Sequence, residues 1–270
     1  MNITEILSLA DHGPDTFVGT GPRYPWGGLY GGQIVAQALR AAAATVDPEF
    51  RPHSLRAYFI RPGDHNDPVR YEVDRTRNGN SFCTRRVIAR QAIGAILNLE
   101  ASFHRGEESV SFQTYDMDAV QTADELADGE SPFVSSFERR FVPGTDERGR
   151  VRGWFRMKAD LGDDPVLQAC ALAYISDDLP TDAVIRAHPI GKRTRDEIHE
   201  GVFSASLDHT IWFHRPLRTD EWHLHDFTCH GFTDSRGLAI GHVYAPDGTH
   251  VATIAQEVLL REIRPRKGGN

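Results

Sequence analysis

Two Arg-Pro pairs that each follow a strand-like run, at a fixed separation from each other, are the feature of this sequence that most constrains its fold. Arg61-Pro62 and Arg215-Pro216 are 154 residues apart (216 − 62 = 154), and each pair follows a strand-like run. Gly94 and Gly248, which lie in turns before two further strand-like runs, have the same separation. One offset shared by separate segments indicates a duplicated unit. Duplicated halves can diverge, so that one keeps the chemistry and the other keeps the fold.

The composition argues against several classes of protein. The chain has 270 residues and a net charge of −8, which disfavours non-specific binding of nucleic acid. It has no apolar run near the roughly 20 residues that cross a bilayer, and its first residues do not resemble a signal peptide, so we expect no stable membrane association. Cys83, Cys170 and Cys229 are odd in number and widely spaced. They fit small core residues of a reduced, cytoplasmic protein better than a disulfide framework.

The first half is predicted to contain one helix built from small residues, followed by an antiparallel sheet. A glycine-rich segment leads into residues 33–44, where apolar side chains have helical spacing and most other positions are Gly or Ala. Such a helix allows close approach of neighbouring backbone. Strand-like runs follow near 53–60, 69–77, 81–91 and 94–103.

The stretch after these strands breaks the pattern. It is acidic and poor in strand signals, and we interpret residues 105–135 as a linker. A solvated helix around Ala119–Leu126 is compatible with that interpretation.

The second half repeats the order of the first. Asp163-Asp164-Pro165 is a typical helix start, with a capping Asp and a Pro in the first turn, and an Ala-rich apolar segment follows. Strands are expected at Trp154–Lys158 and then near 203–214, 222–232, 236–245 and 249–260. The best-fitting fold is α+β, with a sheet wrapped around a central helix in each of two tandem units. We place these units at 1–104 and 136–264, with a tail at 265–270.

Several separate motifs, in order, resemble the acyl-CoA thioesterase II family. They are Gly31-Gly32-Gln33, Arg61-Pro62-Gly63, Asn78-Gly79-Asn80-Ser81-Phe82, Leu207-Asp208-His209, Trp212-Phe213-His214-Arg215-Pro216 and Gln256-Glu257. The likeness runs from about residue 15 to 261. It implies a double hotdog fold, hydrolysis of acyl-CoA to a free fatty acid and coenzyme A, no metal or other cofactor, and at least a dimer of double hotdogs.

The resemblance also implies a hydrolytic trio of Asp, Ser or Thr, and Gln. It identifies Asp177 in the segment Tyr174-Ile175-Ser176-Asp177, Ser206 two residues before an Asp-His pair, and Gln256 before a Glu. Asp177 is expected at the C-terminal end of a helix, where the helix dipole disfavours a carboxylate. In the implied mechanism Asp177, bonded to Ser206, activates water as general base, and Gln256 holds the water or the carbonyl.

Each member of the trio also has an ordinary structural interpretation. Asp177 or Asp178 could cap the short segment 179–181, Ser206 could be an exposed strand serine, and Gln256 could bond a neighbouring loop. No Gly-x-Ser-x-Gly motif signals a nucleophilic serine, so attack by water is favoured. Subtracting 154 from 206, 208 and 256 gives Pro52, Ser54 and Ser102. The first half thus lacks the matching groups, and we expect one site per chain.

Five further residues are candidates for contact with the substrate. They are Gly31, Gly32, His53, Arg85 and Arg236. A backbone N–H near the two glycines would stabilise the oxyanion, and the arginines would meet coenzyme A phosphates. His53, expected just before a first-half strand, is a competing base. Surface solvation explains each arginine equally well.

A metal site is not expected. His223 and His225 share a strand face and could contribute two ligands, but no third ligand is evident, and a solvated face explains them better. Two other functions remain open: a hotdog enoyl-CoA hydratase, and a non-catalytic acyl-CoA binding protein. The chain lacks the Asn-Pro-x-His setting of that hydratase class, and the presence of all three trio residues argues against simple binding.

Overall fold

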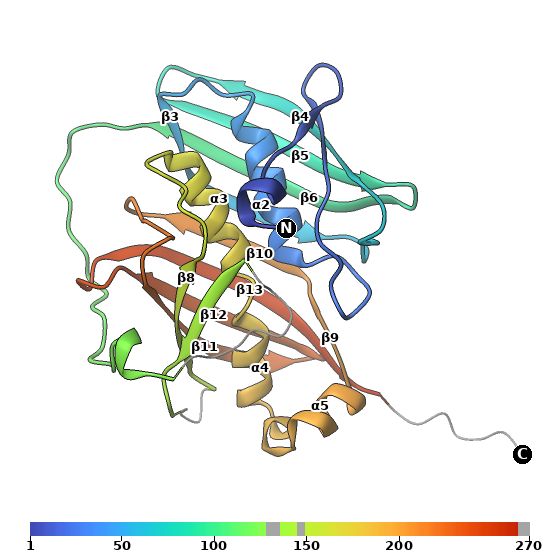
Figure 1. Cartoon of the computed structure of the whole chain (residues 1–270), viewed down its shortest axis with the longest axis vertical. Coiled ribbons are helices and arrows are strands. Elements are labelled where there is room, and N and C mark those ends of the chain that lie inside the picture. Colours follow the sequence, from blue (N-terminus) through green and yellow to red (C-terminus); the bar gives the residue numbers. More distant parts are fainter. Residues whose placement is uncertain (128–135, 145–148, 264–270) are drawn as a thin grey trace, which may run out of the picture.

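The computed structural model describes residues 1–127, 136–144 and 149–263. Within them, thirteen strands form a single antiparallel sheet, with the helices on one side of it (Figure 1). Part of the predicted linker, residues 128–135, and the predicted tail at 265–270 lie outside the described residues. The limits of the two predicted units remain a prediction.

The first half of the sheet has the strand order β1-β2-β4-β5-β6-β3. Its strands are β1 (Ala10–Asp11), β2 (Thr16–Gly19), β3 (Phe50–Phe59), β4 (Val69–Asn78), β5 (Phe82–Gln91) and β6 (Gly94–Arg105). The four strands predicted here are confirmed. The positive φ of 112° at Gly94, the first residue of β6 after the turn from β5, explains why this position is glycine.

The second half continues the sheet with the order β10-β13-β12-β11-β8-β7, and β9 pairs with the far end of β13. Its strands are β7 (Phe137–Phe141), β8 (Val151–Met157), β9 (Val202–Ser206), β10 (Asp208–Phe213), β11 (His223–Thr233), β12 (Arg236–Tyr244) and β13 (His250–Glu262). The halves meet where β3 pairs antiparallel with β10, with Tyr58 opposite Asp208 and Ser54 opposite Trp212.

Two central helices, α2 (Gly31–Ala43) and α3 (Pro165–Ile175), pack against each other on the same side of the sheet (Figure 1). Most of α2 is buried, including its glutamines, and its small side chains allow this. Asp164 caps α3 as predicted by accepting from the amides of Val166 and Leu167. After a four-residue break, α4 (Pro180–Ala187) packs on β11, β12 and β13. The sequence analysis did not predict α4.

The remaining helical segments are short. They are α1 (Ile3–Ile6), η1 (Ala123–Glu125), η2 (Pro189–Lys192) and α5 (Arg195–Gly201). No helix in the described part of the chain has the length and apolar character needed to span a membrane.

The two Arg-Pro pairs make similar contacts in the two halves, with acceptors that differ by one position from the offset of 154. The Nη1 group of Arg61 donates to the carbonyl of Ala95, and that of Arg215 donates to the carbonyl of His250, both at 2.8 Å. Each arginine therefore fastens the end of one strand to the start of the strand that follows the next glycine turn. The duplication inferred from the offset has a direct structural counterpart.

The predicted strand at 203–214 is interrupted at Leu207 by a bulge. Ser206 lies opposite Val258, whereas Thr210 lies opposite Ala255, so β9 and β10 contain one more residue than the facing part of β13. Side chains three positions apart on a regular strand face opposite sides. The extra residue reverses this alternation, which lets Ser206 and His209 point to the same side.

The described part of the predicted linker packs on the second half of the sheet. Trp154 donates through Nε1 to the carbonyl of Gln121, and Gln113 bonds both the carbonyl of Gly248 and the amide of His250. Ala123 is buried in a small apolar cluster with Leu224 and neighbours. The alternative of a solvated helix around Ala119–Leu126 is therefore wrong, because only the short turn η1 forms and its first residue is buried.

Candidate active site

The three residues of the predicted trio come from three separate elements and meet at one place. Asp177 lies in the break between α3 and α4, Ser206 ends β9, and Gln256 lies in the middle of β13. The alternative that Asp177 or Asp178 caps the next helix is wrong. Leu179 is the N-cap residue of α4, and that end has no capping side chain.

A short hydrogen-bond network joins the trio. The hydroxyl of Ser206 donates to Oδ1 of Asp177 at 3.2 Å, and Nε2 of Gln256 donates to Oγ of Ser206 at 2.8 Å. The backbone N–H of Gly32, in the first turn of α2, donates to the other carboxylate oxygen of Asp177 at 3.0 Å. Both halves of the chain thus contribute to one site.

The glycine pair at the start of α2 is what permits this contact. A Cβ on Gly31 would lie 2.6 Å from Oδ2 of Asp177, and a Cβ on Gly32 would lie 2.2 Å from the carbonyl oxygen of Tyr174. Both distances are too short for any side chain. Gly31 and Gly32 therefore determine how closely α2 approaches the end of α3.

The surroundings of Asp177 shift its proton affinity. Burial raises the pKa of Asp177 to about 6, while hydrogen bonds from Gln256, Ser206 and Gly32 act in the opposite direction. The carboxylate lies beyond the C-terminus of α3, where the helix dipole disfavours it, and at the N-terminus of α2, where the dipole favours it. A partly exposed carboxylate with a pKa near 6 is ionised at neutral pH and suited to accept a proton.

A buried ion pair holds the segment that carries Asp177. Nη1 of Arg139, on β7, lies 2.7 Å from Oδ2 of Asp178, and both side chains are at most 12% exposed. Burial raises the pKa of Asp178, and Arg139 partly opposes that effect. This pair anchors the break between α3 and α4 to the edge of the sheet.

Two residues of the network were not identified from the sequence. His209, on β10, lies with Nδ1 2.5 Å from Oε1 of Gln256 and with Nε2 2.8 Å from Oγ of Ser176. Both His209 and Ser176 are fully buried. Each is part of a motif already noted, next to Asp208 and to Asp177 respectively, but position in a motif does not show which face a side chain occupies.

His53 lies elsewhere. It is inside β3 and not before it, and its Nε2 is 2.8 Å from the hydroxyl of Ser102. Its ring meets the stacked rings of Phe82 and His104 edge-on. Because His53 is next to Ser54, which faces Trp212, it lies toward the opposite end of β3 from the part that faces Asp208. It takes no part in the network around Asp177.

The two candidate arginines differ sharply. Arg85 is only 1% exposed, and its guanidinium donates to the side chain and carbonyl of Thr45, to the carbonyls of Arg77 and Thr84, and to the Asn78 side chain. This burial contradicts the expectation of a phosphate contact, because the charged group cannot reach solvent. Arg236 is 41% exposed and pairs with Glu257 at 3.0 Å, so its proposed contact with substrate remains a prediction.

His223 and His225 are buried, so the expectation of a solvated face is wrong. Their rings lie 5.1 Å apart, and His225 also packs against Phe155. Burial lowers the pKa of His223 to about 4 and that of His225 well below its usual value. Among residues 1–127, 136–144 and 149–263, no cluster of three or more His, Cys, Asp or Glu side chains is arranged to hold a metal ion.

The three cysteines are buried and unpaired. At most 8% of any of them is exposed, and burial raises the pKa of Cys170 to about 12. Their predicted place in the core is confirmed, and the buried Cys170 is not a reactive thiolate.

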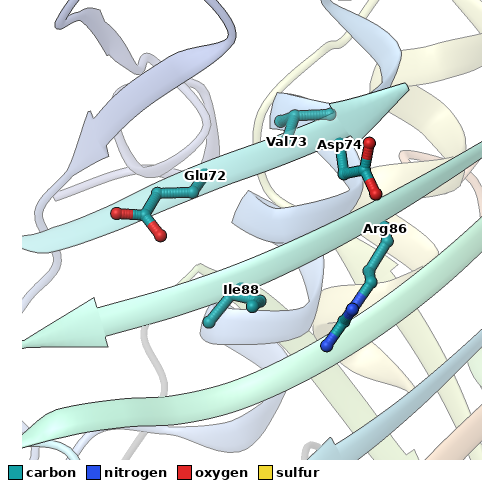
Figure 2. Close-up of a pocket in the computed structure, with 5 residues that line it drawn as sticks. All are labelled: Glu72, Val73, Asp74, Arg86 and Ile88. Atoms are coloured by element: carbon teal, nitrogen blue, oxygen red, sulfur yellow. The ribbon is translucent and has the colours of Figure 1, made fainter. Parts of the chain in front are cut away.

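A groove of about 280 Å³ lies on the outer face of β4 and β5 (Figure 2). It is lined by Glu72, Val73, Asp74, Arg86 and Ile88. Most of these residues alternate with buried side chains that face α2, such as Tyr71 and Val87. The groove therefore lies on the face of β4 and β5 that is turned away from α2, and none of the trio residues lines it.

Comparisons with known proteins agree with this architecture. A family model described as the acyl-CoA thioesterase N-terminal domain matches residues 20–104, and one described as the acyl-CoA thioesterase C-terminal domain matches residues 115–260. The chain is 32% identical over 297 residues to acyl-coenzyme A thioesterase 8 of Homo sapiens. The matched region covers 98% of this chain and 90% of that protein.

Two solved structures show the same fold. The tesB protein of Mycobacterium avium subspecies paratuberculosis has a TM-score of 0.83 and 33% identity, with 96% of this chain and 98% of that chain covered. A protein of Alicyclobacillus acidocaldarius, described as having a hot dog fold, has a TM-score of 0.81 and 21% identity, with coverage of 97% and 98%. The predicted double hotdog fold is confirmed.

Replacing Arg85 by Met tests its structural role. The variant leaves the buried carbonyl of Thr45 without its donor, so we expect the free energy of unfolding to fall by about 3 kcal/mol. The matched variant Arg236→Met removes a half-exposed pair, and its effect should stay within about 1 kcal/mol. Urea denaturation of both variants measures the difference. Equal, small effects would show that Arg85 is not a structural residue.

Proposed function

The chain belongs to the acyl-CoA thioesterase II family and hydrolyses acyl-CoA to a free fatty acid and coenzyme A, and we propose that Asp177, Ser206 and Gln256 carry out this reaction. The observation that supports this assignment most directly is the Asp177 carboxylate. It accepts from Ser206 and Gly32, its pKa is raised to about 6, and part of it remains accessible. Such a carboxylate is suited to general-base catalysis near neutral pH.

In the proposed reaction, Asp177 takes a proton from a water molecule as the water oxygen attacks the thioester carbonyl. Ser206 donates to the carboxylate and accepts from Gln256, so it holds the base in one orientation. The NH2 group of Gln256 also acts on Asp177 in this structure, and we assign this second N–H to the attacking water or to the carbonyl oxygen once substrate is bound. The tetrahedral intermediate then breaks its C–S bond, and the proton held by Asp177 passes to the departing thiolate.

The negative oxygen of that intermediate needs a donor, and the start of α2 supplies one. Among the first three amides of this helix, that of Gly32 donates to Asp177 and that of Gln33 donates to the Tyr30 carbonyl. We therefore assign the oxyanion contact to the amide of Gly31, where the helix dipole also favours negative charge. The thiolate leaves without strong acid assistance, because a thiol of this kind has a pKa of about 8.5.

Replacing Asp177 by Asn tests the general base. We expect turnover to fall by about 10²–10⁴-fold with the fold retained, because Asn cannot accept the proton. Ser206→Ala should also lose turnover, whereas Ser206→Thr keeps the hydroxyl and should stay close to the parent. Asp163→Asn, at an exposed carboxylate, is the control. Thiol release with a panel of acyl-CoA substrates measures all four variants. An Asp177→Asn variant with normal turnover refutes the assignment.

The pH dependence follows from the raised pKa of Asp177. The carboxylate is ionised above about pH 6 and protonated below it, so kcat/KM should be constant above pH 7 and fall about tenfold per unit below pH 6. Burial lowers the pKa of His209 to about 4, so this neighbour does not titrate in the same range. Thiol release measured from pH 5 to 9 tests this. A flat profile down to pH 5 would contradict the role of Asp177.

We also propose that the chain forms a homodimer or a higher homo-oligomer through the outer face of the central strands. Tyr58 on β3, Trp212 on β10 and Leu238 on β12 are each at least 39% exposed on that face. Large apolar side chains gathered on one surface are typical of protein interfaces.

Trp212→Glu is the test of this interface. Light scattering of the parent should give a multiple of 30.2 kDa, and the variant should shift toward the mass of one chain because a buried charge opposes association. Ile93→Glu, in the exposed turn between β5 and β6, is the matched control and should leave the mass unchanged. A parent that already has the mass of one chain would refute the proposal.

A cytoplasmic location completes the proposal. All three cysteines are unpaired and buried, which fits a protein that folds in a reducing compartment.

A further inference from the structure

The hydrogen bonds of the hydrolytic site continue inward past Gln256. In order, they join Asp177, Ser206, Gln256, His209 and Ser176. The last three side chains are fully buried. A buried chain of this kind has one favourable direction, because every donor must meet an acceptor.

The carboxylate end fixes that direction. An ionised Asp177 can only accept, so Ser206 uses its single hydrogen to donate to it. The oxygen of Ser206 must then accept from Nε2 of Gln256, which turns the amide oxygen toward His209. That oxygen can only accept. His209 must therefore carry its proton on Nδ1.

The state of His209 agrees with this requirement. Burial keeps the ring neutral at physiological pH, with its pKa lowered to about 4, so only one of its nitrogens carries a proton. With the proton on Nδ1, the other nitrogen must accept, and the hydroxyl of Ser176 lies 2.8 Å from it. Ser176 has one alternative acceptor, the carbonyl of Ala173 at 3.0 Å.

That alternative breaks the chain. If Ser176 donated to Ala173, His209 would have to donate through Nε2, and its bare Nδ1 would face the amide oxygen of Gln256 at 2.5 Å. Two acceptors at that distance repel each other, and the amide would rotate to present its oxygen to Ser206. In that orientation the amide oxygen of Gln256 has no hydrogen to donate to the oxygen of Ser206. It would also face the lone pairs of the attacking water.

We propose that His209, oriented by Ser176, is a positioning residue that keeps the Gln256 amide turned so that its NH2 group faces Ser206 and the reacting water. The inference rests on the proposed role of the trio. The bulge at Leu207 makes it possible, because it places Ser206 and His209 on one side of the strand, where both reach Gln256.

The test compares two substitutions of His209. In His209→Asn the side-chain amide nitrogen stands near the position of Nδ1 and can still donate to Gln256. In His209→Leu no donor remains. We expect kcat of the Leu variant to fall about tenfold or more with KM within about twofold of the parent, because the change affects the orientation of a bound group rather than binding. The Asn variant should retain kcat within about threefold.

The outcomes separate this inference from the proposed function. Asp177→Asn is measured in parallel, and normal turnover in that variant overturns both. If Asp177→Asn is inactive but His209→Leu keeps the parental kcat, only the positioning role fails. The positioning role also fails alone if His209→Asn and His209→Leu lose kcat equally while both keep the parental melting temperature. NMR of the parent with ¹⁵N-labelled histidine adds a test that needs no active variant. The His209 ring, assigned by the signal lost in His209→Asn, should carry its proton on Nδ1 at pH 7. A proton on Nε2 overturns the inference.

Discussion

The contact between the amide of Gly32 and the carboxylate of Asp177 is the constraint on which the rest of the site depends. It joins the start of the first central helix to the end of the second, so it exists only when the two halves of the chain pack side by side. The C-terminus of α3 alone would disfavour a carboxylate at this position, and the N-terminus of α2 offsets that effect. The approach needs Gly31 and Gly32, since a side chain at either position would collide with the opposing segment. One half therefore supplies the space and the amide, while the other supplies the acid.

The two halves use opposite charges at corresponding places. In the first half, the buried guanidinium of Arg85 donates to the carbonyl and hydroxyl of Thr45, just beyond the C-terminal end of α2. A positive charge there agrees with the helix dipole. The offset of 154 aligns Arg85 with Ala239, a small residue that pairs with Gln256 on the adjacent strand. The half that serves the fold thus carries a buried cation at the position where the half assigned to the chemistry carries a small, buried residue.

The sequence predicted the order of the two central helices and of most strands because the signals for these are local. The Asp164 cap and the glycine turns are readable from neighbouring residues, and the offset comes from comparing such local signals in the two halves. The face of the sheet on which a side chain lies cannot be predicted in the same way, because one extra residue in a strand moves the following side chains to the other face. For this reason the bulge at Leu207, the inward direction of His209 and the burial of His223 were not foreseen. Arg85 was misjudged for a related reason: charge predicts exposure on average, and only the three-dimensional arrangement shows that its acceptors are all internal. The trio itself came from resemblance, not from spacing.

The raised proton affinity of Asp177 has a cost for stability. Its pKa is about 6 in the folded chain against 3.8 as the ordinary value, so the folded state binds this proton more tightly than the unfolded state does. The resulting stabilisation is fully present below the unfolded pKa and is lost as the pH rises through the folded one. At neutral pH, the free energy of unfolding is then about 3 kcal/mol lower than it would be if the pKa of Asp177 were unshifted. This is a substantial part of the stability of a typical domain. The Arg139–Asp178 pair and the chain through His209 surround this carboxylate with fixed partners. They hold a destabilising group in one position, which is the condition under which its affinity for protons can serve catalysis.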